Sequence, residues 1–362
     1  MTPVTEHTRL EGTGSVCVVT TRDDVTADLV IPEISRLGAP VLRVHLDDFP
    51  QTMRLSATGP KWAGTLGVGN RHVRLEKIRA VWWWHPEPVR IAPGVGMTLE
   101  QAEWASREAN AGVAGVLAAL PNCLHVNHPA ATYAAQSKAD VLVQAPLHGL
   151  AMPPTWIGNA PAEAQEFASG QERVMCKSLS GPTIRYRDAH ATLFTTPVKP
   201  AQLDERIAAG AHQLQYAVDK QFEVRLVVVG EDMFAARIDA HSTAARADYR
   251  ADYGALSYTT VSVPDSVRDG VIRLMAHYGL VYAALDLLVD ADGRWLLIDL
   301  NPSGQYGWIE QALPNLRISA AIAELLCHAG NGEPHAGNNE KHLINYADWQ
   351  QSGRQRPEYT SP

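Results

Sequence analysis

The chain has 362 residues, of which 46% are hydrophobic and 19% are charged, so it is long enough for two or three compact units. Its formal net charge of −8 argues against general binding to DNA or RNA. No apolar run approaches the roughly 18 residues of a spanning helix, and the first residues lack a signal-peptide pattern. Four widely spaced cysteines in apolar surroundings indicate reduced core residues. The sequence predicts a soluble cytoplasmic protein that binds neither nucleic acid nor membranes.

Residues 1–125 are predicted to form an N-terminal α/β domain. In chain order it contains a strand "SVCVVTT", a helix "ADLVIPEISRLG" that ends at Gly38, the strands "APVLRVHL" and "IRAVWWWHPEPV", and a long helix "TLEQAEWASREANAGVAGVLAAL". No G-x-G-x-x-G turn follows the first strand, so no dinucleotide site is predicted. The run "WWW" at 82–84 is more typical of a packed strand end than of a ligand platform.

The composition changes after residue 125. A loop and a helix of about 13 residues around Lys138 precede a strand entered through Pro153 and Pro154. The segments "RVMCKSLS", "GPTIRYR" and "HATLFTTPV" predict short strands rich in turns. From about residue 211 follow the strands "HQLQYAV", "FEVRLVVVG" and "DMFAARIDA", the helix "VRDGVIRLMAHYG", a hairpin and the helix "RISAAIAELLCHAG". The last 30 or so residues are polar, and we expect a loosely held tail.

The hairpin "LDLLVDADGRWLLIDLNP" carries acidic side chains among apolar ones. With Asp292-Gly293 as a two-residue loop, Asp286 faces Asp299 with their Cβ atoms about 4.5–5.5 Å apart. Asn301 then lies on the same face as Asp299. Two facing carboxylates are destabilising unless a cation neutralises them, and an all-oxygen ligand set favours Mg²⁺ or Mn²⁺ completed by nucleotide phosphates. A three-residue loop would shift this register by one, and an exposed hairpin face with scattered acids is the alternative interpretation.

The pattern D…DLNPSGQYGW, preceded by "FEVRLVVVG" and by lysine-bearing segments, resembles the ATP-grasp superfamily. More narrowly, it is similar to the ligases that mature ribosomal peptides, the graspetide (microviridin-type) macrocyclases, in an actinobacterial branch that the Ala/Arg-rich composition suits. The similarity covers roughly residues 80–330. It implies an α/β ATP-grasp fold, with a pre-ATP-grasp domain at 1–125, a central lid-type α+β subdomain at 126–217, and a C-terminal α+β subdomain with an antiparallel sheet and the metal site at 218–330. The polar tail is 331–362.

The resemblance also implies the nucleotide contacts. Lys138 in "AAQSKADVLVQ" and Lys177 in "VMCKSLSG" occupy the places of the two nucleotide-binding lysines. The segment "QYAVDK" looks like the interdomain hinge, where the backbone of two residues reads the adenine edge and an acid or lysine lies near the ribose. The implied hinge contacts are Gln215, Tyr216, Val218, Asp219 and Lys220. Taken alone, Lys138 is typical of a solvated helix residue and Lys177 of a strand edge.

The phosphate and metal side follows in the same way. Arg225 and Arg250 match the family's phosphate-side arginines, which we take as catalytic, and the implied magnesium ligands are Asp286, Asp299 and Asn301. An ion pair between Arg225 and Glu223, and a solvated Arg250, are the structural alternatives. The middle ligand, Asp299, is usually Glu in this superfamily, "WWWHPEP" lacks the usual arginines, and the hinge has Asp219 where proline is common.

The resemblance implies an ATP-dependent ligase that activates Asp or Glu side chains of a precursor peptide as acyl phosphates. The ligase then closes ω-ester or ω-amide rings with Ser/Thr hydroxyls or Lys amines. The implied cofactors are ATP and one or two Mg²⁺ ions, for which Mn²⁺ can substitute; the implied partners are a leader-plus-core precursor peptide and a second copy in a homodimer. "GPTIRYRDAHATL" would be a lid strand over the nucleotide. A ligase that adds amino acids without forming a ring, and a non-catalytic ATP-binding regulatory module, are the alternatives.

Overall fold

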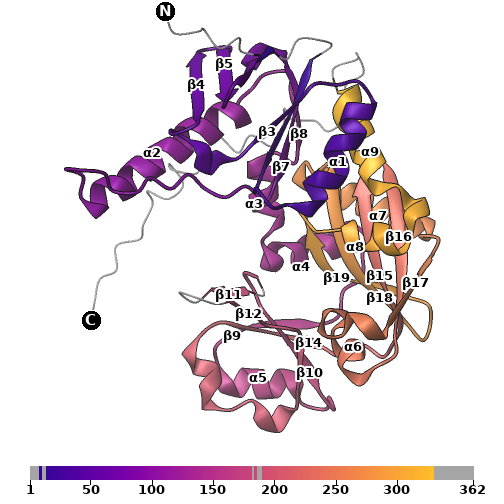
Figure 1. The fold of residues 1–362 in the computed structure, drawn as a ribbon. Coiled ribbons are helices and arrows are strands. Elements are labelled where there is room, and N and C mark those ends of the chain that lie inside the picture. The colour runs from indigo at the N-terminus through magenta and orange to yellow at the C-terminus, as the bar shows by residue number, and fades with distance from the viewer. Residues whose placement is uncertain (1–7, 10–13, 182, 186–189, 330–362) are drawn as a thin grey trace, which may run out of the picture.

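The structure is a computed structural model that describes residues 8–9, 14–181, 183–185 and 190–329 (Figure 1). The predicted tail, 331–362, lies outside the described residues, as do residues 182 and 186–189 of the predicted lid strand. Three parts are visible in Figure 1: an N-terminal α/β part, a central sheet with one helix beneath it, and a C-terminal sheet. No described helix has the length and apolar character needed to cross a membrane.

The N-terminal part is built on a parallel sheet, as the sequence predicts. Its strands, in the order β3-β2-β7-β8, are β2 (Ser15–Thr20), β3 (Val41–Val44), β7 (Ile78–Trp84) and β8 (Leu124–Val126). Every residue of β2 is buried, as expected of a strand covered on both faces. Helices α1 (Val25–Arg36) and α2 (Leu99–Ala118) accompany the sheet. The three tryptophans at 82–84 are buried in the core, which confirms the interpretation as a packed strand end.

A second, mostly antiparallel sheet in this part is missing from the sequence prediction. Its strands, in the order β1-β6-β5-β4, are β1 (Thr8–Arg9), β4 (Met53–Thr58), β5 (Ala63–Val68) and β6 (Arg71–Arg74). The half-exposed strand β5 contains two glycines, and glycine-rich strands give a weak pattern. Gly64 is required there, because a Cβ atom would lie 2.0 Å from the backbone oxygen of Ser56.

The central part holds an antiparallel sheet with strand order β13-β10-β14-β9. Its strands are β9 (Thr155–Gly158), β10 (Val174–Lys177), β13 (Thr196–Val198) and β14 (His212–Tyr216), and the described part of the predicted lid contains β11 (Thr183–Arg185) and β12 (His190–Thr192). Helix α5 (Pro161–Ala168) packs on one face of the four-stranded sheet through a small apolar cluster. The predicted helix around Lys138 is two helices, α3 (Pro129–Ala135) and α4 (Lys138–Leu147). Ser137 separates them, because its hydroxyl caps α4 by accepting the N–H of Asp140 at 3.3 Å.

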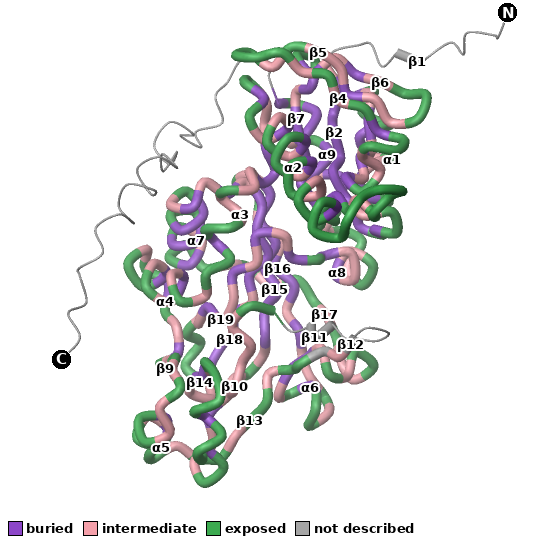
Figure 2. Tube along the Cα trace, turned by 90° about the vertical axis from the view of Figure 1, so that its left-hand side faces the viewer, coloured by how far each residue is buried: buried purple, intermediate pink, exposed green. Residues whose placement is uncertain are grey.

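The C-terminal part is a five-stranded antiparallel sheet in the order β17-β16-β15-β18-β19. Its strands are β15 (Lys220–Val229), β16 (Asp232–Ala240), β17 (Leu256–Thr260), β18 (Tyr282–Asp290) and β19 (Trp295–Asn301). One face packs under α3, α4 and α7 (Asp265–Tyr278). The other face begins in a core shared with α1, α9 (Ile318–His328) and the parallel sheet, and Figure 2 shows this buried region running between the two sheets.

The shared core sets where the polar residues emerge. Tyr282 and Ala284 of β18 lie in it, and the next residues on the same face are Asp286 and Leu288, which leave the core and face the central sheet. Because the core crosses from the first to the last part, the N-terminal domain docks on the C-terminal sheet. We propose that the domain boundaries lie after residues 125 and 217.

Asn127 joins the two parts with four hydrogen bonds and is 2% exposed. Its Nδ2 donates to the carbonyls of Tyr282 (2.7 Å) and Pro302 (2.8 Å), and its Oδ1 accepts the N–H groups of Val281 (2.8 Å) and Tyr282 (3.0 Å). These bonds hold the beginning of β18 against the turn that follows β19. The side chain therefore supports both strands that carry the acidic pair.

Replacing Asn127 with alanine is expected to lower the free energy of unfolding by about 3 kcal/mol or more, because it leaves several buried backbone groups without a partner. Urea denaturation measures this change. The control is Asn159→Ala, an exposed position that should shift stability by less than about 0.5 kcal/mol. Equal effects of the two substitutions would contradict the clamp role of Asn127.

Candidate active site

The hairpin brings the two predicted acids face to face by a different route from the predicted one. The loop has three residues, 291–293, closed by hydrogen bonds from the N–H of Asp290 to the oxygen of Arg294 (3.1 Å) and from the N–H of Gly293 to the oxygen of Asp290 (3.0 Å). The predicted two-residue loop is wrong. A β-bulge at Ile298 adds one residue to β19, so that Asp286 still pairs directly with Asp299, and the predicted facing pair is confirmed.

Each acid of this pair has one basic neighbour. Asp286 accepts a hydrogen bond from Nη1 of Arg225 (3.0 Å), its register partner on β15, and Tyr249 Oη lies 3.5 Å from the same oxygen. Asp299 lies 3.8 Å from the Nζ atom of Lys138. Burial raises the pKa of Asp299 above its usual value, and Asp286 raises it further against the opposing effect of Lys138. The pair therefore carries like charges that its neighbours neutralise only in part.

Arg225 is buried, with its side chain 7% exposed. Its second hydrogen bond runs from Nη2 to the carbonyl of Gln305 (2.8 Å). The ion pair with Glu223, which the sequence left open, is absent: Glu223 instead binds the ammonium of Lys220 at 2.7 Å. Arg225, Asp286 and Asp299 thus form one row across β15, β18 and β19.

Two further cations reach the same region from other elements. Lys177, the last residue of β10, donates from Nζ to Oε1 of Gln215 (2.7 Å), and burial lowers its pKa to about 8. Arg250 binds Asp248 through two hydrogen bonds, of 2.8 Å from Nε and 2.6 Å from Nη2, so it is held in place and not freely solvated. Lys138 also donates to the carbonyl of Ser178 (2.9 Å). Four cations from four elements therefore surround two carboxylates.

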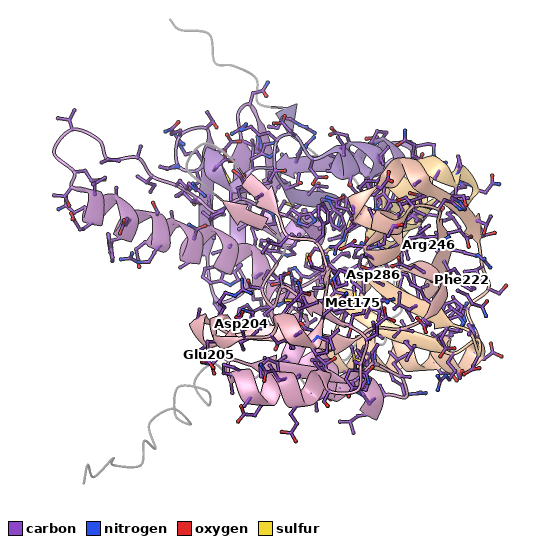
Figure 3. All side chains as sticks on the ribbon, turned by 90° about the horizontal axis from the view of Figure 1, so that it is seen from below. Met175, Asp204, Glu205, Phe222, Arg246 and Asp286 are labelled. Atoms are coloured by element: carbon purple, nitrogen blue, oxygen red, sulfur yellow. The ribbon has the colours of Figure 1, made fainter. Side chains whose placement is uncertain are left out.

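A cavity of about 440 Å³ lies between the central sheet and the C-terminal sheet. Figure 3 shows Met175 of β10 and Asp286 of β18 close together at this junction, and both line the cavity. Its apolar lining includes Met175, Leu288 and Ile298. Its charged lining includes Lys177, Arg250 and Asp286. A molecule with an apolar body and an anionic group fits this mixed lining.

The predicted residues fall into three groups by position. Those that line the cavity are Lys177, Gln215, Tyr216, Val218, Lys220, Arg250 and Asp286. Arg225 and Asp299 do not line it but contact or pair with Asp286, and Lys138 contacts Asp299. Asn301 follows on β19, where its Oδ1 accepts the N–H of Ser303 (3.0 Å). Asp219 is exposed and lies outside the lining, so its predicted contact with the ribose has no support from its position.

One backbone hydrogen bond joins the predicted hinge to the segment before β9. The N–H of Tyr216 donates to the carbonyl of Pro154 (3.0 Å). Pro154 has no N–H to return this bond, so the Tyr216 carbonyl receives none from it. Tyr216 itself lines the cavity.

Several lining residues were missed from the sequence. They include Arg246 of α6 (Thr243–Ala247), Tyr249 of the 3₁₀ turn Tyr249–Ala251, and Asp248 between these two elements. The segment "RADYRADY" has no helical or strand period, and a solvated charge run is the alternative interpretation of its Arg250. The spacing of Asp248 and Arg250 is the only signal there, because an aspartate often binds the backbone two residues ahead.

The donors present fit a magnesium–nucleotide complex. Carboxylate and amide oxygens are the ligands that Mg²⁺ prefers, and the surrounding cations match phosphate oxygens. Among residues 14–181 and 190–329, no group of three or more Asp, Glu, His or Cys side chains could hold a metal alone. The remaining ligands would therefore come from phosphates and water.

A second cavity, of about 950 Å³, lies beside the turn that follows β19. Val25 and Leu29 of α1, Gln305, and Trp308 of α8 (Gly307–Ala312) are among its lining residues. The ring of Trp308 packs on Tyr249, with centroids 5.6 Å apart, and Tyr249 lines the first cavity. The two cavities are therefore neighbours across one aromatic contact.

Comparisons with known proteins agree with this architecture. Residues 15–132 match the family model "MvdD pre-ATP grasp domain". A RiPP-associated ATP-grasp ligase from Chryseobacterium gregarium, solved with ADP and a leader and core peptide, is 26% identical with a TM-score of 0.78, over 89% of this chain and 98% of that one. The macrocyclase MdnC from Microcystis aeruginosa, solved with precursor peptide MdnA, is 27% identical with a TM-score of 0.74, over 86% and 98%.

A third solved structure adds support for the fold alone. The ATP-grasp ligase PsnB, solved with a variant of its minimal precursor, Mg and ADP, is 21% identical with a TM-score of 0.69, over 87% of this chain and 98% of that one. A search among curated proteins found no match. The predicted α/β ATP-grasp fold with a pre-ATP-grasp domain is confirmed.

Proposed function

We propose that the chain is an ATP-grasp ligase of the type that matures ribosomal peptides and that it forms rings in a precursor peptide. A side-chain carboxylate of Asp or Glu attacks the γ-phosphorus of ATP, and ADP leaves. A Ser/Thr hydroxyl or a Lys amine then attacks the acyl phosphate, loses its proton, and displaces phosphate to give an ω-ester or an ω-amide. The observation that carries the proposal is the convergence of Lys138, Lys177, Arg225 and Arg250 on the facing Asp286 and Asp299.

Each residue has a role that follows from its position. Met175, Leu288 and Ile298 enclose the adenine, while the carbonyl of Tyr216 accepts from its amino group. Lys177 and Arg250 bind phosphate oxygens, where negative charge builds during transfer. Arg225 holds Asp286 in place. Asp286, Asp299 and Asn301 would hold Mg²⁺, which when bound neutralises the phosphates and the facing carboxylates.

The second cavity gives the peptide a place beside the transferring phosphate. Its volume of about 950 Å³ exceeds that of the nucleotide cavity, and Gln305 joins it to Arg225 through the 2.8 Å hydrogen bond. Apolar Val25 and Leu29 together with Glu33 and Arg317 suit a segment of mixed peptide side chains. A substrate larger than a free amino acid is therefore favoured.

The finer parts of the proposal rest on the resemblance. They are two Mg²⁺ ions with Mn²⁺ as a substitute, a leader-plus-core peptide, a homodimer, a cytoplasmic setting and an actinobacterial origin. Light scattering on the purified protein tests the homodimer, for which the expected mass is twice 39.4 kDa. A mass of one chain would remove this part without affecting the catalytic proposal.

Mass spectrometry tests the reaction directly. The protein is incubated with ATP, Mg²⁺ and candidate peptides rich in Ser/Thr or Lys and in Asp/Glu, taken from short reading frames near its gene. The expected product has lost one water per ring, with one ADP formed for each. Added hydroxylamine should instead trap the acyl phosphate as a hydroxamate. ADP formation with a free amino acid and no peptide dehydration would favour the ligase without ring formation, and ATP binding without any turnover would favour the regulatory module.

The pH dependence of ATP binding should report on Lys177. Because its pKa of about 8 lies below the ordinary 10.5, the ammonium loses its proton as pH rises through 8, and phosphate binding must then restore it. The affinity for ATP should fall by up to about tenfold per pH unit above pH 8. The same shift makes the folded state bind fewer protons than the unfolded chain between pH 8 and 10.5, so this group adds stability as pH rises through that window.

Calorimetric titrations between pH 7 and pH 9.5 measure this effect. The matched variant is Lys177→Arg, whose guanidinium stays charged throughout and should flatten the profile. An identical slope in the two proteins would contradict the assignment to Lys177.

A further inference from the structure

A chain of hydrogen bonds links Lys177 to the backbone through two polar side chains. Lys177 Nζ donates to Oε1 of Gln215 (2.7 Å), and Nε2 of Gln215 donates to Oγ1 of Thr155 (2.9 Å). Thr155 Oγ1 in turn donates to the carbonyl oxygen of Pro153 (3.0 Å). Thr155 on β9 faces Gln215 on β14 in register, and Gln215 is 2% exposed.

Lys177 and the carbonyl of Pro153, at the two ends of this series of hydrogen bonds, determine the orientation of the Gln215 amide between them. A carbonyl oxygen can only accept, so the hydroxyl of Thr155 uses its single proton on Pro153. Thr155 is then an acceptor for the amide of Gln215, which must turn its NH₂ group toward Thr155. An ammonium can only donate, so the oxygen of the amide faces Lys177. If the amide were reversed, its NH₂ group would face the ammonium of Lys177, donor against donor. Its oxygen would face the lone pairs of the Thr155 hydroxyl, acceptor against acceptor.

The fixed amide lies in the wall of the cavity. Gln215 is the first residue of the hinge and lines the cavity with Lys177 and with the apolar Met175, Leu288 and Ile298. Adenine carries an amino group at C6, which donates, whereas guanine carries a carbonyl there, which accepts. An amide oxygen held toward the cavity accepts from adenine and repels guanine. The reversed amide would favour guanine instead.

We propose that Thr155 is a positioning residue that strengthens the preference for adenine over guanine nucleotides by holding the NH₂ end of the Gln215 amide, whose oxygen end is held by Lys177. The proposal rests on the proposed function, since it requires a nucleotide in this cavity. Thr155 itself does not line the cavity and acts only through Gln215. A hydroxyl that lies outside the cavity therefore contributes to base selectivity through Gln215.

Calorimetry with ADP and GDP, in the presence of Mg²⁺, tests the proposal on the full chain. The wild type should prefer ADP. In Thr155→Val, which keeps the shape and loses the hydroxyl, only Lys177 still holds the amide in this orientation, and the ratio of ADP to GDP affinity should fall by up to about tenfold, the size of one net hydrogen bond. Thr155→Ser restores a hydroxyl and should restore the ratio.

The chain offers a matched control in the same sheet. Thr196 makes the same local bond, from Oγ1 to the carbonyl of Phe194 (3.0 Å), and has no link to Gln215 in the described residues. Thr196→Val should leave the ratio unchanged. A second background separates orientation from packing: Gln215→Glu presents oxygen at both ends, so adding Thr155→Val to it should no longer change the ratio.

The outcomes separate this inference from the proposed function. A wild type that binds neither nucleotide would overturn both. A wild type that binds ADP selectively, with an unchanged ratio in Thr155→Val, would overturn only the role of Thr155. An equal loss of selectivity in Thr155→Val with and without Gln215→Glu would also overturn it, because the effect would then be one of packing.

Discussion

Replacing Asp299 with alanine is expected to abolish ATP-dependent turnover, by at least about a thousandfold, while the protein stays folded. Turnover falls because the metal site loses one of its two carboxylates. The fold persists because the substitution removes one of two like charges that face each other across β18 and β19, at the cost of a 3.8 Å contact with Lys138. ADP release in the presence of Mg²⁺ measures the loss of turnover, and thermal unfolding without Mg²⁺ measures stability.

Asp292 is the matched control for this substitution. It lies in the loop of the same hairpin, and its side chain is 79% exposed. Asp292→Ala should retain nearly full turnover. Full activity in Asp299→Ala would remove Asp299 from the metal site, and a large loss of stability would show that the facing acids are held by structural contacts alone.

Replacing Arg225 with methionine should have the opposite effect on stability and an equally large effect on turnover. The substitution leaves Asp286 without its 3.0 Å partner, still facing Asp299, and leaves the carbonyl of Gln305 without its donor. Breaking a buried ion pair from one side costs about 3–5 kcal/mol. Turnover should fall by about a thousandfold or more, because Asp286, a proposed metal ligand, loses the cation that holds it in place.

The control lies on the neighbouring strand. Arg237 of β16 pairs with Asp239 at 2.7 Å, with its side chain 38% exposed, and Arg237→Met should cost less than about 1 kcal/mol. Chemical denaturation with and without Mg²⁺ compares the two variants. An Arg225→Met protein as stable as Arg237→Met would show that Asp286 does not depend on Arg225.

The candidate site was largely predictable because its residues break the apolar pattern of their strands. Asp286 and Asp299 stand among buried neighbours, and Arg225 lies across from one of them. The sequence did not predict how the hairpin reaches this register. The three-residue loop and the bulge at Ile298 offset each other in register, and neither has a distinct signature in a run of Trp, Leu and Ile.

Partners were harder to predict than positions. Glu223 and Arg225 share a strand face, yet the arginine pairs across the sheet and the glutamate pairs with Lys220, because strand neighbours two residues apart compete with directly facing ones. Tyr249 and Asp248 were missed because a 3₁₀ turn lacks periodicity. The parallel strands of the first domain were found from their apolar runs, whereas β4–β6 were not, since they alternate weakly and contain glycine.

Calorimetric titration of ATP into the purified protein, first with Mg²⁺ and then with EDTA, tests the central claim most directly. The facing acids and the four cations predict one ATP bound per chain in the presence of Mg²⁺, with binding lost in EDTA and in Asp286→Asn. Absence of binding under both conditions, or binding that is indifferent to Mg²⁺ and to Asp286, would contradict the assignment of this cavity to a magnesium–nucleotide complex.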